Sequence, residues 1–173
     1  MGSLNWTAVD PELVAKPVAA ALDSWPAAAD VAVAPIDADL ADTAAFCEKY
    51  GVTLEDSANC VVIAGRRAAE VSYAACLVLA TTRADVNGVV RKRLNARKAS
   101  FAPMDDAVRL TGMEYGGITP IGLPDDWPVL IDAAVLERDV VVIGSGIRAS
   151  KLALPSAALA ALPAAEVIEG LAS

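Results

Sequence analysis

Two glycine turns that adjoin short apolar runs constrain this chain most strongly. Gly116 to Gly122 reads GGITPIG and precedes the apolar run 129–132, while Gly144-Ser145-Gly146 directly follows the apolar run 140–143. Glycine adopts positive φ freely and lets the backbone approach a ligand closely. Successive N–H groups in such turns can form an anion-binding concavity. The pattern predicts strands bounded by turns, and leaves open whether these are ordinary tight turns or parts of one pocket.

Length and composition limit the class of protein. The 173 residues suffice for one domain with a buried core, in which valine, leucine and isoleucine must do most of the packing because alanine supplies much of the 55% hydrophobic content. No apolar run approaches the roughly 20 residues of a membrane span, so we expect a cytoplasmic protein. The chain has no histidine, and Cys47, Cys60 and Cys76 lack the spacing of a metal site. We therefore expect reduced thiols, no metal and no organic cofactor.

The order of predicted elements favours an α+β fold with a mixed sheet rather than a strict alternation of strands and helices. Asp10-Pro11 is a helix start, and Gly51 and Gly112 are helix stops. A turn at 65–67 is expected to join a hairpin. The expected helices are 10–25, 39–50, 85–95, 103–111, 155–162 and 163–171. The expected strands are 29–36, 59–64, 70–80, 128–133, 139–144 and 147–154.

Charge is distributed unevenly along the chain. The net charge is −8, yet the segment 83–98 holds six basic residues and one acid, which gives 6 − 1 = +5. A local basic surface on an acidic protein can bind phosphates while the acidic remainder limits non-specific binding. Arg91, Arg93 and Lys98 are the candidate contacts to a nucleic-acid backbone. A solvated helix face is the alternative explanation of this segment.

Six segments follow one another in a characteristic order. They are Lys49-Tyr50-Gly51-Val52, Ser57 to Val62, Arg109-Leu110-Thr111-Gly112, Gly116 to Gly122, Val129 to Asp132, and Gly144-Ser145-Gly146. This ordered set resembles the YbaK / prolyl-tRNA-synthetase-associated editing domain family over about residues 53–162. The resemblance implies an α+β fold with a partly opened, barrel-like sheet flanked by helices, and a pocket at one end. It also implies hydrolysis of wrongly charged aminoacyl-tRNA, with the aminoacylated 3′ end of tRNA as partner.

One position departs from the family pattern. Family members carry a lysine at the start of the strand where this chain has Asn59. The family lysine is thought to anchor the tRNA end or polarise the ester, whereas asparagine offers hydrogen bonds without charge. Asn59 is also compatible with a merely structural role at the start of a strand.

The resemblance and the glycine turns together define a candidate site. Backbone donors in the turns would stabilise the oxyanion of ester hydrolysis. Cys60, next to Asn59, is expected to be a core thiol rather than a nucleophile, because no histidine base exists. The catalytic candidates are Asn59, Gly116, Gly117 and Ser145. The substrate-binding candidates are Thr119, Pro120, Asp132, Gly144, Gly146, Arg148, Arg91, Arg93 and Lys98.

Three functions remain open at the level of sequence. The first is a trans-acting aminoacyl-tRNA deacylase in which residues 29–173 form the editing domain and residues 1–28 form a helical extension. The second is a non-catalytic module of the same fold that binds tRNA or a nucleotide, which the uncharged Asn59 favours. The third is an interaction protein whose first helix forms a homodimer.

Overall fold

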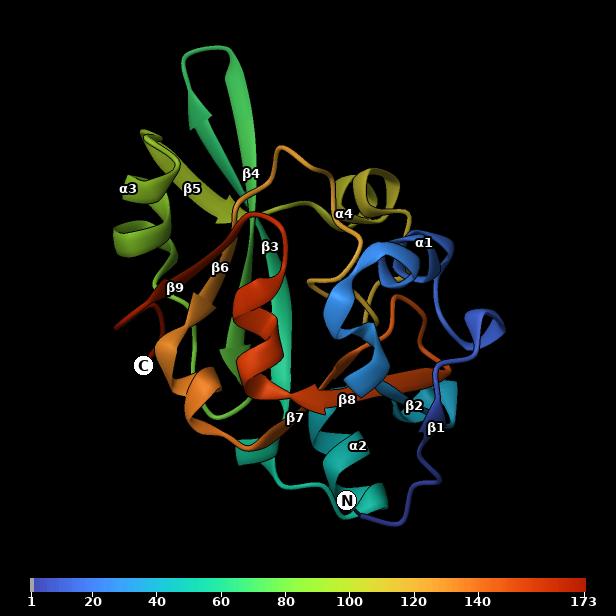
Figure 1. Cartoon of the computed structure of the whole chain (residues 1–173). Helices are drawn as coiled ribbons and strands as arrows, with labels where there is room; N and C mark the ends of the chain where they lie inside the picture. Colours follow the sequence, from blue (N-terminus) through green and yellow to red (C-terminus); the bar gives the residue numbers. More distant parts are fainter. Residues whose placement is uncertain (1) are drawn as a thin grey trace.

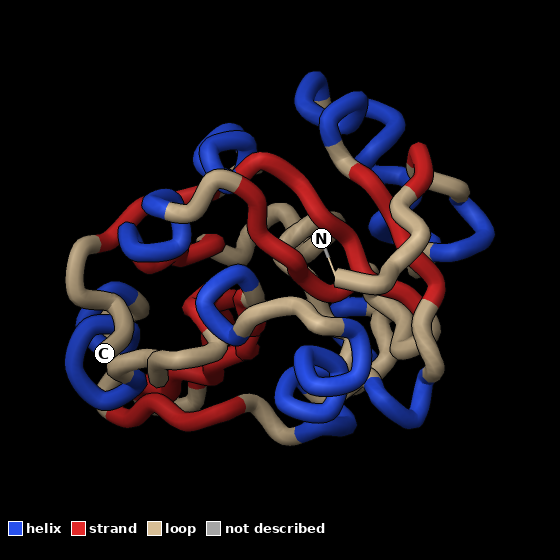
Figure 2. The backbone as a smooth tube through the Cα atoms, turned by 90° about the horizontal axis from the view of Figure 1, so that it is seen from below, coloured by secondary structure: helices blue, strands red, loops and turns tan. Residues whose placement is uncertain are grey.

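In the computed structural model, which describes residues 2–173, two β-sheets run in different directions and helices pack around them (Figures 1 and 2). One sheet is antiparallel, in the order β1-β2-β8-β7, and the other is mixed, in the order β5-β3-β4-β6-β9. The strands are β1 (Thr7–Ala8), β2 (Ala32–Pro35), β3 (Ala58–Arg67), β4 (Glu70–Leu79), β5 (Lys98–Phe101), β6 (Val129–Asp132), β7 (Val140–Gly144), β8 (Ser150–Pro155) and β9 (Ala165–Ile168). The predicted α+β class with a mixed sheet is confirmed, and within the described residues the sheets do not close into a barrel.

The helices are short, and glycine ends two of them as expected. Gly51 and Gly112 adopt left-handed φ values of 72° and 68° at the ends of α2 and α4. The α-helices are α1 (Lys16–Ser24), α2 (Thr43–Tyr50), α3 (Arg91–Arg93) and α4 (Met104–Thr111). The 3₁₀ turns are η1 (Pro11–Leu13), η2 (Pro26–Asp30), η3 (Ala38–Leu40), η4 (Leu54–Asp56), η6 (Ala133–Glu137) and η7 (Ser156–Ala161), and η5 (Val86–Val90) is a π-helical turn. No helix within residues 2–173 is long and apolar enough to cross a membrane.

The first helix begins later than its capping residue predicts. The Asp10 carboxylate accepts a hydrogen bond from the Glu12 N–H, but it caps the single turn η1 rather than α1. The chain is extended at Val14 and Ala15, and α1 starts at Lys16. Both of these extended residues are buried, so packing against the core interrupts the expected continuous helix.

The last predicted helix, 163–171, is wrong, because this segment contains strand β9. Residues 165–168 pair in parallel with β6, from Val129↔Ala165 to Asp132↔Ile168. The open edge of β6 offers backbone hydrogen bonds that a helix could not use. A strong tertiary partner therefore overrides the local helical pattern.

The predicted hairpin is confirmed, but its turn lies further along the chain than residues 65–67. Strand β3 continues to Arg67, which pairs with Glu70, and the turn contains Ala68 at φ 55°. Gly65 is not a turn residue, because it pairs with Ser72 and with Ala99 inside the sheet. Strand β5 was not predicted, since its mostly exposed sequence KASF shows no apolar alternation.

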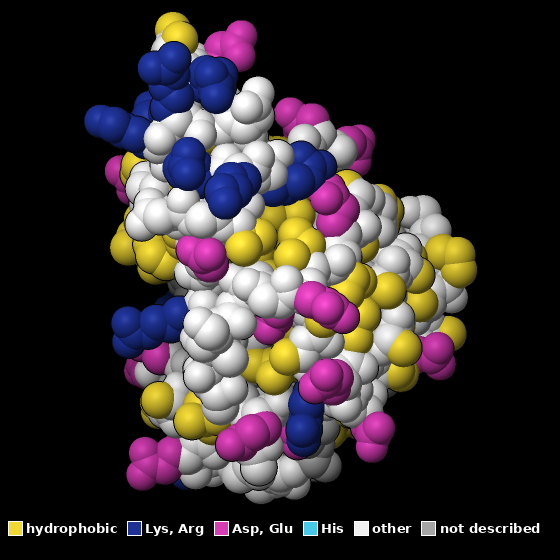
Figure 3. Space-filling view, turned by 90° about the vertical axis from the view of Figure 1, so that its left-hand side faces the viewer, with side chains coloured by type: hydrophobic (Ala, Val, Ile, Leu, Met, Phe, Trp, Pro, Cys, Tyr) yellow, Lys and Arg dark blue, Asp and Glu magenta, His cyan; other side chains and the backbone are white. Residues whose placement is uncertain are grey.

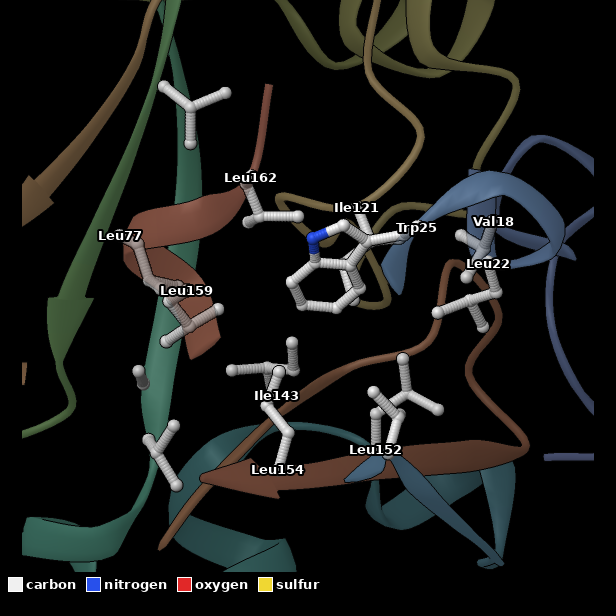
Figure 4. Packing of buried hydrophobic residues seen from close by; sticks show 14 of the residues in the cluster. Val18, Leu22, Trp25, Leu77, Ile121, Ile143, Leu152, Leu154, Leu159 and Leu162 are labelled. Atoms are coloured by element: carbon white, nitrogen blue, oxygen red, sulfur yellow. The ribbon is translucent and has the colours of Figure 1, made fainter. Parts of the chain in front are cut away.

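The largest core cluster joins the first helix to both sheets (Figure 4). Trp25 lies among Ile121, Ile143 and Leu162, and its indole N–H donates to the Ala161 carbonyl over 3.3 Å. Val18 and Leu22 of α1 also belong to this cluster, so the N-terminal helix packs on the same core as the sheets.

A close backbone approach fixes the end of β7 against the first glycine loop. A Cβ atom added at Gly144 would lie 2.5 Å from the Gly117 carbonyl oxygen and 2.7 Å from that of Ile118. Both obstacles are backbone atoms, which cannot rotate away as a side chain can. Only glycine fits at position 144 without moving the loop.

We therefore expect Gly144→Ala to lower the free energy of unfolding by about 1–3 kcal/mol, the usual cost of overpacking. Gly170→Ala is the control, because nothing lies within 4 Å of an added Cβ there, although its φ of 74° carries some strain. Urea denaturation of both variants measures the difference. Equal losses in the two variants would contradict the packing argument.

Candidate active site

A cavity of about 260 Å³ lies where the start of α2, strand β3, the first glycine loop and the ends of β7 and β8 meet. It brings together residues separated by more than a hundred positions in the chain. Its walls are formed by Ala41, Asp42, Thr43, Ala58, Asn59, Cys60, Val61, Val62, Phe101, Ala102, Ala107, Tyr115, Gly116, Ile118, Gly144 and Lys151. Asn59, Gly116 and Gly144 are the sequence-predicted site residues among them.

The two glycine turns contact each other directly. The Gly146 N–H donates to the Gly117 carbonyl over 2.7 Å, and the Gly146 carbonyl accepts from the Glu114 N–H over 2.9 Å. The Gly117 N–H donates to the Glu114 carbonyl over 3.0 Å. The N–H groups of Gly117 and Gly146 are thus engaged in holding the turns together. Neither residue lines the cavity, which leaves Gly116 and Gly144 as the turn residues at its wall.

Ser145 is fully buried, and its hydroxyl is engaged inside the second turn. It donates to the carbonyls of Ile147 and Ser150, each over 3.1 Å, and accepts from the Ser150 hydroxyl over 2.7 Å. Its carbonyl accepts from the Ala15 N–H, which ties the turn to the start of α1. These bonds give Ser145 a role in shaping the turn.

Asn59 lies on β3 and is held by helix α2. The Thr43 hydroxyl donates to the Asn59 side-chain oxygen over 2.6 Å. Since that bond occupies the oxygen, the amide nitrogen is the group left for a ligand, and no acceptor for it is found within residues 2–173. Asn59 therefore presents two neutral N–H donors at the cavity.

Arg148 links the glycine loop to the turn before α2. Its guanidinium donates to the Ala38 carbonyl over 3.2 Å and to the Tyr115 carbonyl over 3.3 Å, and lies 3.9 Å from the Asp42 carboxylate. Its backbone N–H donates to Glu114 over 2.7 Å. Arg148 does not line the cavity itself. It holds two of the walls in place.

Lys151 is a cavity residue that the sequence analysis missed. It is only 8% exposed, its ammonium donates to the Ala41 carbonyl over 3.1 Å, and it lies 5.1 Å from the centre of the Phe46 ring. Burial lowers the pKa of Lys151, with smaller effects from Cys47 and Asp42, which raise it, and from Arg148, which lowers it further. The sequence does contain a signal for this residue. Strand β8 reads SKLALP, so a single lysine directly precedes an apolar run.

Two exposed aromatic side chains border the same cavity. Phe101, at the end of β5, is 62% exposed, and Tyr115, in the first glycine loop, is 51% exposed. Their rings offer flat apolar surfaces beside the polar interior of the cavity.

The sequence profile of the aminoacyl-tRNA editing domain matches residues 37–162 of this chain, a range that contains every residue named above in the cavity wall. The chain belongs to the aminoacyl-tRNA editing domain family. The match begins earlier than the segments noted in the sequence and includes α2, whose Thr43 contacts Asn59. A comparison with curated proteins finds no match.

Solved structures share the fold of this editing domain at low sequence identity. A candidate trans-editing enzyme for prolyl-tRNA synthetase superposes with a TM-score of 0.77 at 20% identity, covering 93% of this chain and 97% of its own. A designed scaffold that presents grafted linear epitopes gives a TM-score of 0.75 at 21% identity, covering 90% and 95%. A hypothetical protein gives 0.66 at 22% identity, covering 80% and 86%. These similarities establish the fold.

Gly144 is the one predicted substrate-binding residue in the cavity wall of the described chain, and Thr119, Pro120 and Asp132 are among those that lie outside it. Thr119 is fully buried, and Pro120 lines a separate apolar cavity beside α1. Asp132 is buried at the end of β6, where burial raises its pKa and the backbone N–H groups of Ala172, Leu171 and Ala133 partly offset this by hydrogen bonding to the carboxylate. Asp132 thereby fastens the C-terminal segment to the mixed sheet.

The basic side chains gather on one face of the molecule (Figure 3), and Arg91, Arg93 and Lys98 do not line the cavity. Arg93 forms an ion pair with Glu166 at 2.5 Å, and Arg91 donates to the carbonyls of Asn87 and Ala96. Lys98 is exposed and lies beside Arg66 across the β3–β5 pair. Local contacts thus occupy Arg91 and Arg93, while Lys98 keeps its charge toward solvent.

The cysteines show no sign of catalytic activation. Burial raises the pKa of the Cys60 thiol far above its ordinary value, with a smaller contribution from Cys76, and burial also raises that of Cys76 to about 12. A thiol is a nucleophile only as the thiolate, so the raised pKa argues against Cys60 as a nucleophile, although it borders the cavity. Within the described residues no group of three His, Cys, Asp or Glu side chains could hold a metal ion.

We expect Asp132→Ala to destabilise the protein by about 1.5–3 kcal/mol, because it removes a charged acceptor from buried N–H groups. Asp139→Ala, at an exposed aspartate in the same region, is the control. Thermal unfolding monitored by circular dichroism measures the effect. Equal unfolding temperatures of Asp132→Ala and Asp139→Ala would contradict this role of Asp132.

Lys151 should make stability depend on alkaline pH. Its pKa is lowered in the folded protein, so between that value and the ordinary 10.5 the unfolded chain binds more protons than the folded one. The free energy of unfolding of the wild type relative to Lys151→Met should therefore rise as pH increases toward 10.5 and level off at lower pH. Denaturant titrations of both proteins from pH 7 upward measure this difference, and a flat difference would contradict it.

Proposed function

We propose that this editing domain is a trans-acting aminoacyl-tRNA deacylase that hydrolyses the ester between a wrong amino acid and the 3′ end of tRNA. The observation that carries the proposal is the meeting of Asn59, Gly116 and Gly144 at one cavity formed by the family's glycine segments. Hydrolysis needs a water molecule, donors for the carbonyl oxygen and a grip on the terminal adenosine. The cavity and its rim offer groups for the last two of these needs.

The size and polarity of the cavity suit the aminoacyl end of the substrate. Its volume of about 260 Å³ is below the usual range for drug-sized ligands, so a small amino acid fits better than a large one. Backbone N–H groups at Gly116 and Gly144 and the amide of Asn59 would donate to the ester carbonyl as it gains negative charge. Removing one such donor in a known hydrolase costs roughly 10²–10³ in rate.

The rim suits the nucleotide part of the substrate. Phe101 and Tyr115 would stack on the terminal bases, since every base has a flat apolar face. The exposed cations Arg66, Arg67 and Lys98 would meet phosphates farther along the acceptor stem. A tRNA could reach both surfaces because β5 carries Lys98 at one end and Phe101 at the other.

A second candidate is a binding module of the same fold without turnover. The neutral side chain at Asn59, where family members have lysine, is the observation that favours it. Incubation with a panel of tRNAs charged with different small amino acids distinguishes the two. Release of the amino acid faster than spontaneous hydrolysis supports the deacylase, and saturable tRNA binding with no release for any member supports the binding module.

Phe101→Ala should raise KM for the hydrolysed tRNA by roughly tenfold or more, because stacking contributes about 1–3 kcal/mol per base. Met104→Ala is the matched control, since Met104 is 54% exposed close by in sequence but does not line the cavity. Steady-state kinetics on the best substrate of the panel measure the change. An unchanged KM for Phe101→Ala would remove Phe101 from the nucleotide contact.

A further inference from the structure

Lys151 brings a positive charge into the wall that Asn59 and Gly144 share. It lies on β8 directly opposite Gly144 on β7, and β7 ends at the glycine turns. Among the residues that line the cavity, Lys151 is the only basic one, and Asp42 is the only acidic one within the described chain. The Asp42 carboxylate is 81% exposed and lies 3.9 Å from the Arg148 guanidinium, so its charge is largely solvated.

The contacts of Lys151 do not compensate for the hydration that its ammonium loses on burial. An ammonium has three N–H donors, and residues 2–173 provide one hydrogen bond, to the Ala41 carbonyl, and the face of the Phe46 ring. No carboxylate in that part of the chain lies within 4.0 Å of the Lys151 ammonium. A buried charge without an ionic partner destabilises a fold. A ligand with a negative oxygen would supply the missing partner.

We propose that Lys151 is a catalytic residue of the cavity, and that its ammonium binds a negatively charged oxygen of the substrate. This inference rests on the proposed function, because it assigns the charge to the same cavity. A cationic Lys151 explains how the site can act with a neutral Asn59, because the positive charge then lies on β8 instead of β3. Asn59 and Lys151 then form a pair, one supplying neutral donors and the other supplying charge.

The chemical step needs no proton from Lys151. The oxygen of a water molecule bonds to the ester carbonyl carbon, and the carbonyl oxygen becomes negative. The bond from that carbon to the ribose oxygen then breaks. One proton of the water ends on the ribose hydroxyl, and the other is released to solvent as the amino acid leaves as a carboxylate. The ammonium remains charged throughout, whether it binds the carbonyl oxygen or the phosphate of the terminal nucleotide.

The central experiment compares Lys151→Met with Lys49→Met in the full-length protein. Lys49 is an exposed lysine on α2 and serves as the control for loss of one positive charge. With the best mischarged tRNA of the panel, we expect Lys151→Met to lower kcat/KM about 100-fold, comparable to loss of one oxyanion donor, and Lys49→Met to leave it unchanged. Lys151→Gln, which keeps donors without charge, should also lose most of the activity.

A rescue experiment separates a functional charge from a structural one. Asn59→Lys in the Lys151→Met background places an ammonium at the same cavity from the other strand, and we expect it to restore kcat/KM at least tenfold. A lysine that only supported the fold could not be replaced from a different strand.

Binding of adenosine 5′-monophosphate and adenosine identifies the oxygen that is bound. If Lys151→Met weakens binding of the monophosphate but not of adenosine, and raises KM, the ammonium holds the phosphate. If it lowers kcat and leaves both affinities unchanged, the ammonium stabilises the carbonyl oxygen. Either result supports the proposal.

The outcomes also separate this inference from the proposed function. Wild-type turnover with an equally active, folded Lys151→Met variant would overturn the role of Lys151 and leave the deacylase standing. No turnover by the wild type on any charged tRNA, together with monophosphate binding that depends on Lys151, would overturn the deacylase and keep the cationic site. Loss of activity in Lys151→Met and Lys151→Gln without any rescue by Asn59→Lys would count against the proposal.

Discussion

The contact between two backbone segments organises this molecule. The Gly146 N–H donates to the Gly117 carbonyl, and Gly144 packs against the carbonyls of Gly117 and Ile118 at a distance that excludes any side chain. This contact joins the end of the antiparallel sheet to the loop that leads into the mixed sheet. Because the atoms that face each other are backbone atoms, a side chain at position 144 could be accommodated only if the loop moved.

Around that contact, side chains from distant segments take supporting roles. Ser145 and Ser150 hold the second turn from inside, and Arg148 ties the first loop to the chain before α2. Thr43 fixes the orientation of Asn59. The groups that face the cavity are therefore held by residues that do not reach a ligand, as preorganised binding requires.

The charge of the cavity is distributed differently from the family pattern. Asparagine occupies the β3 position, and the buried cation stands on β8, opposite Gly144. The two positions lie far apart in sequence but border one space. A substrate needs a positive charge at a given place in the cavity, and the charged side chain can come from more than one strand. Asn59 alone would indicate a site without a positive charge.

The sequence by itself determined the α+β class, the family, the strands around the glycine turns and the helix ends at Gly51 and Gly112, because glycine and apolar runs act locally. Local signals failed where a partner strand decided the structure. The segment of β9 reads as helical and pairs instead with the open edge of β6, and the polar β5 is a strand because β3 lies beside it.

For the candidate site, Asn59 and the turns were predicted from sequence. The burial of Ser145 and Asp132 and the inward position of Lys151 depend instead on which residues meet in space. Only the tertiary structure could place a lysine of β8 and an asparagine of β3 around one cavity, since no local pattern encodes the distance between two sheets.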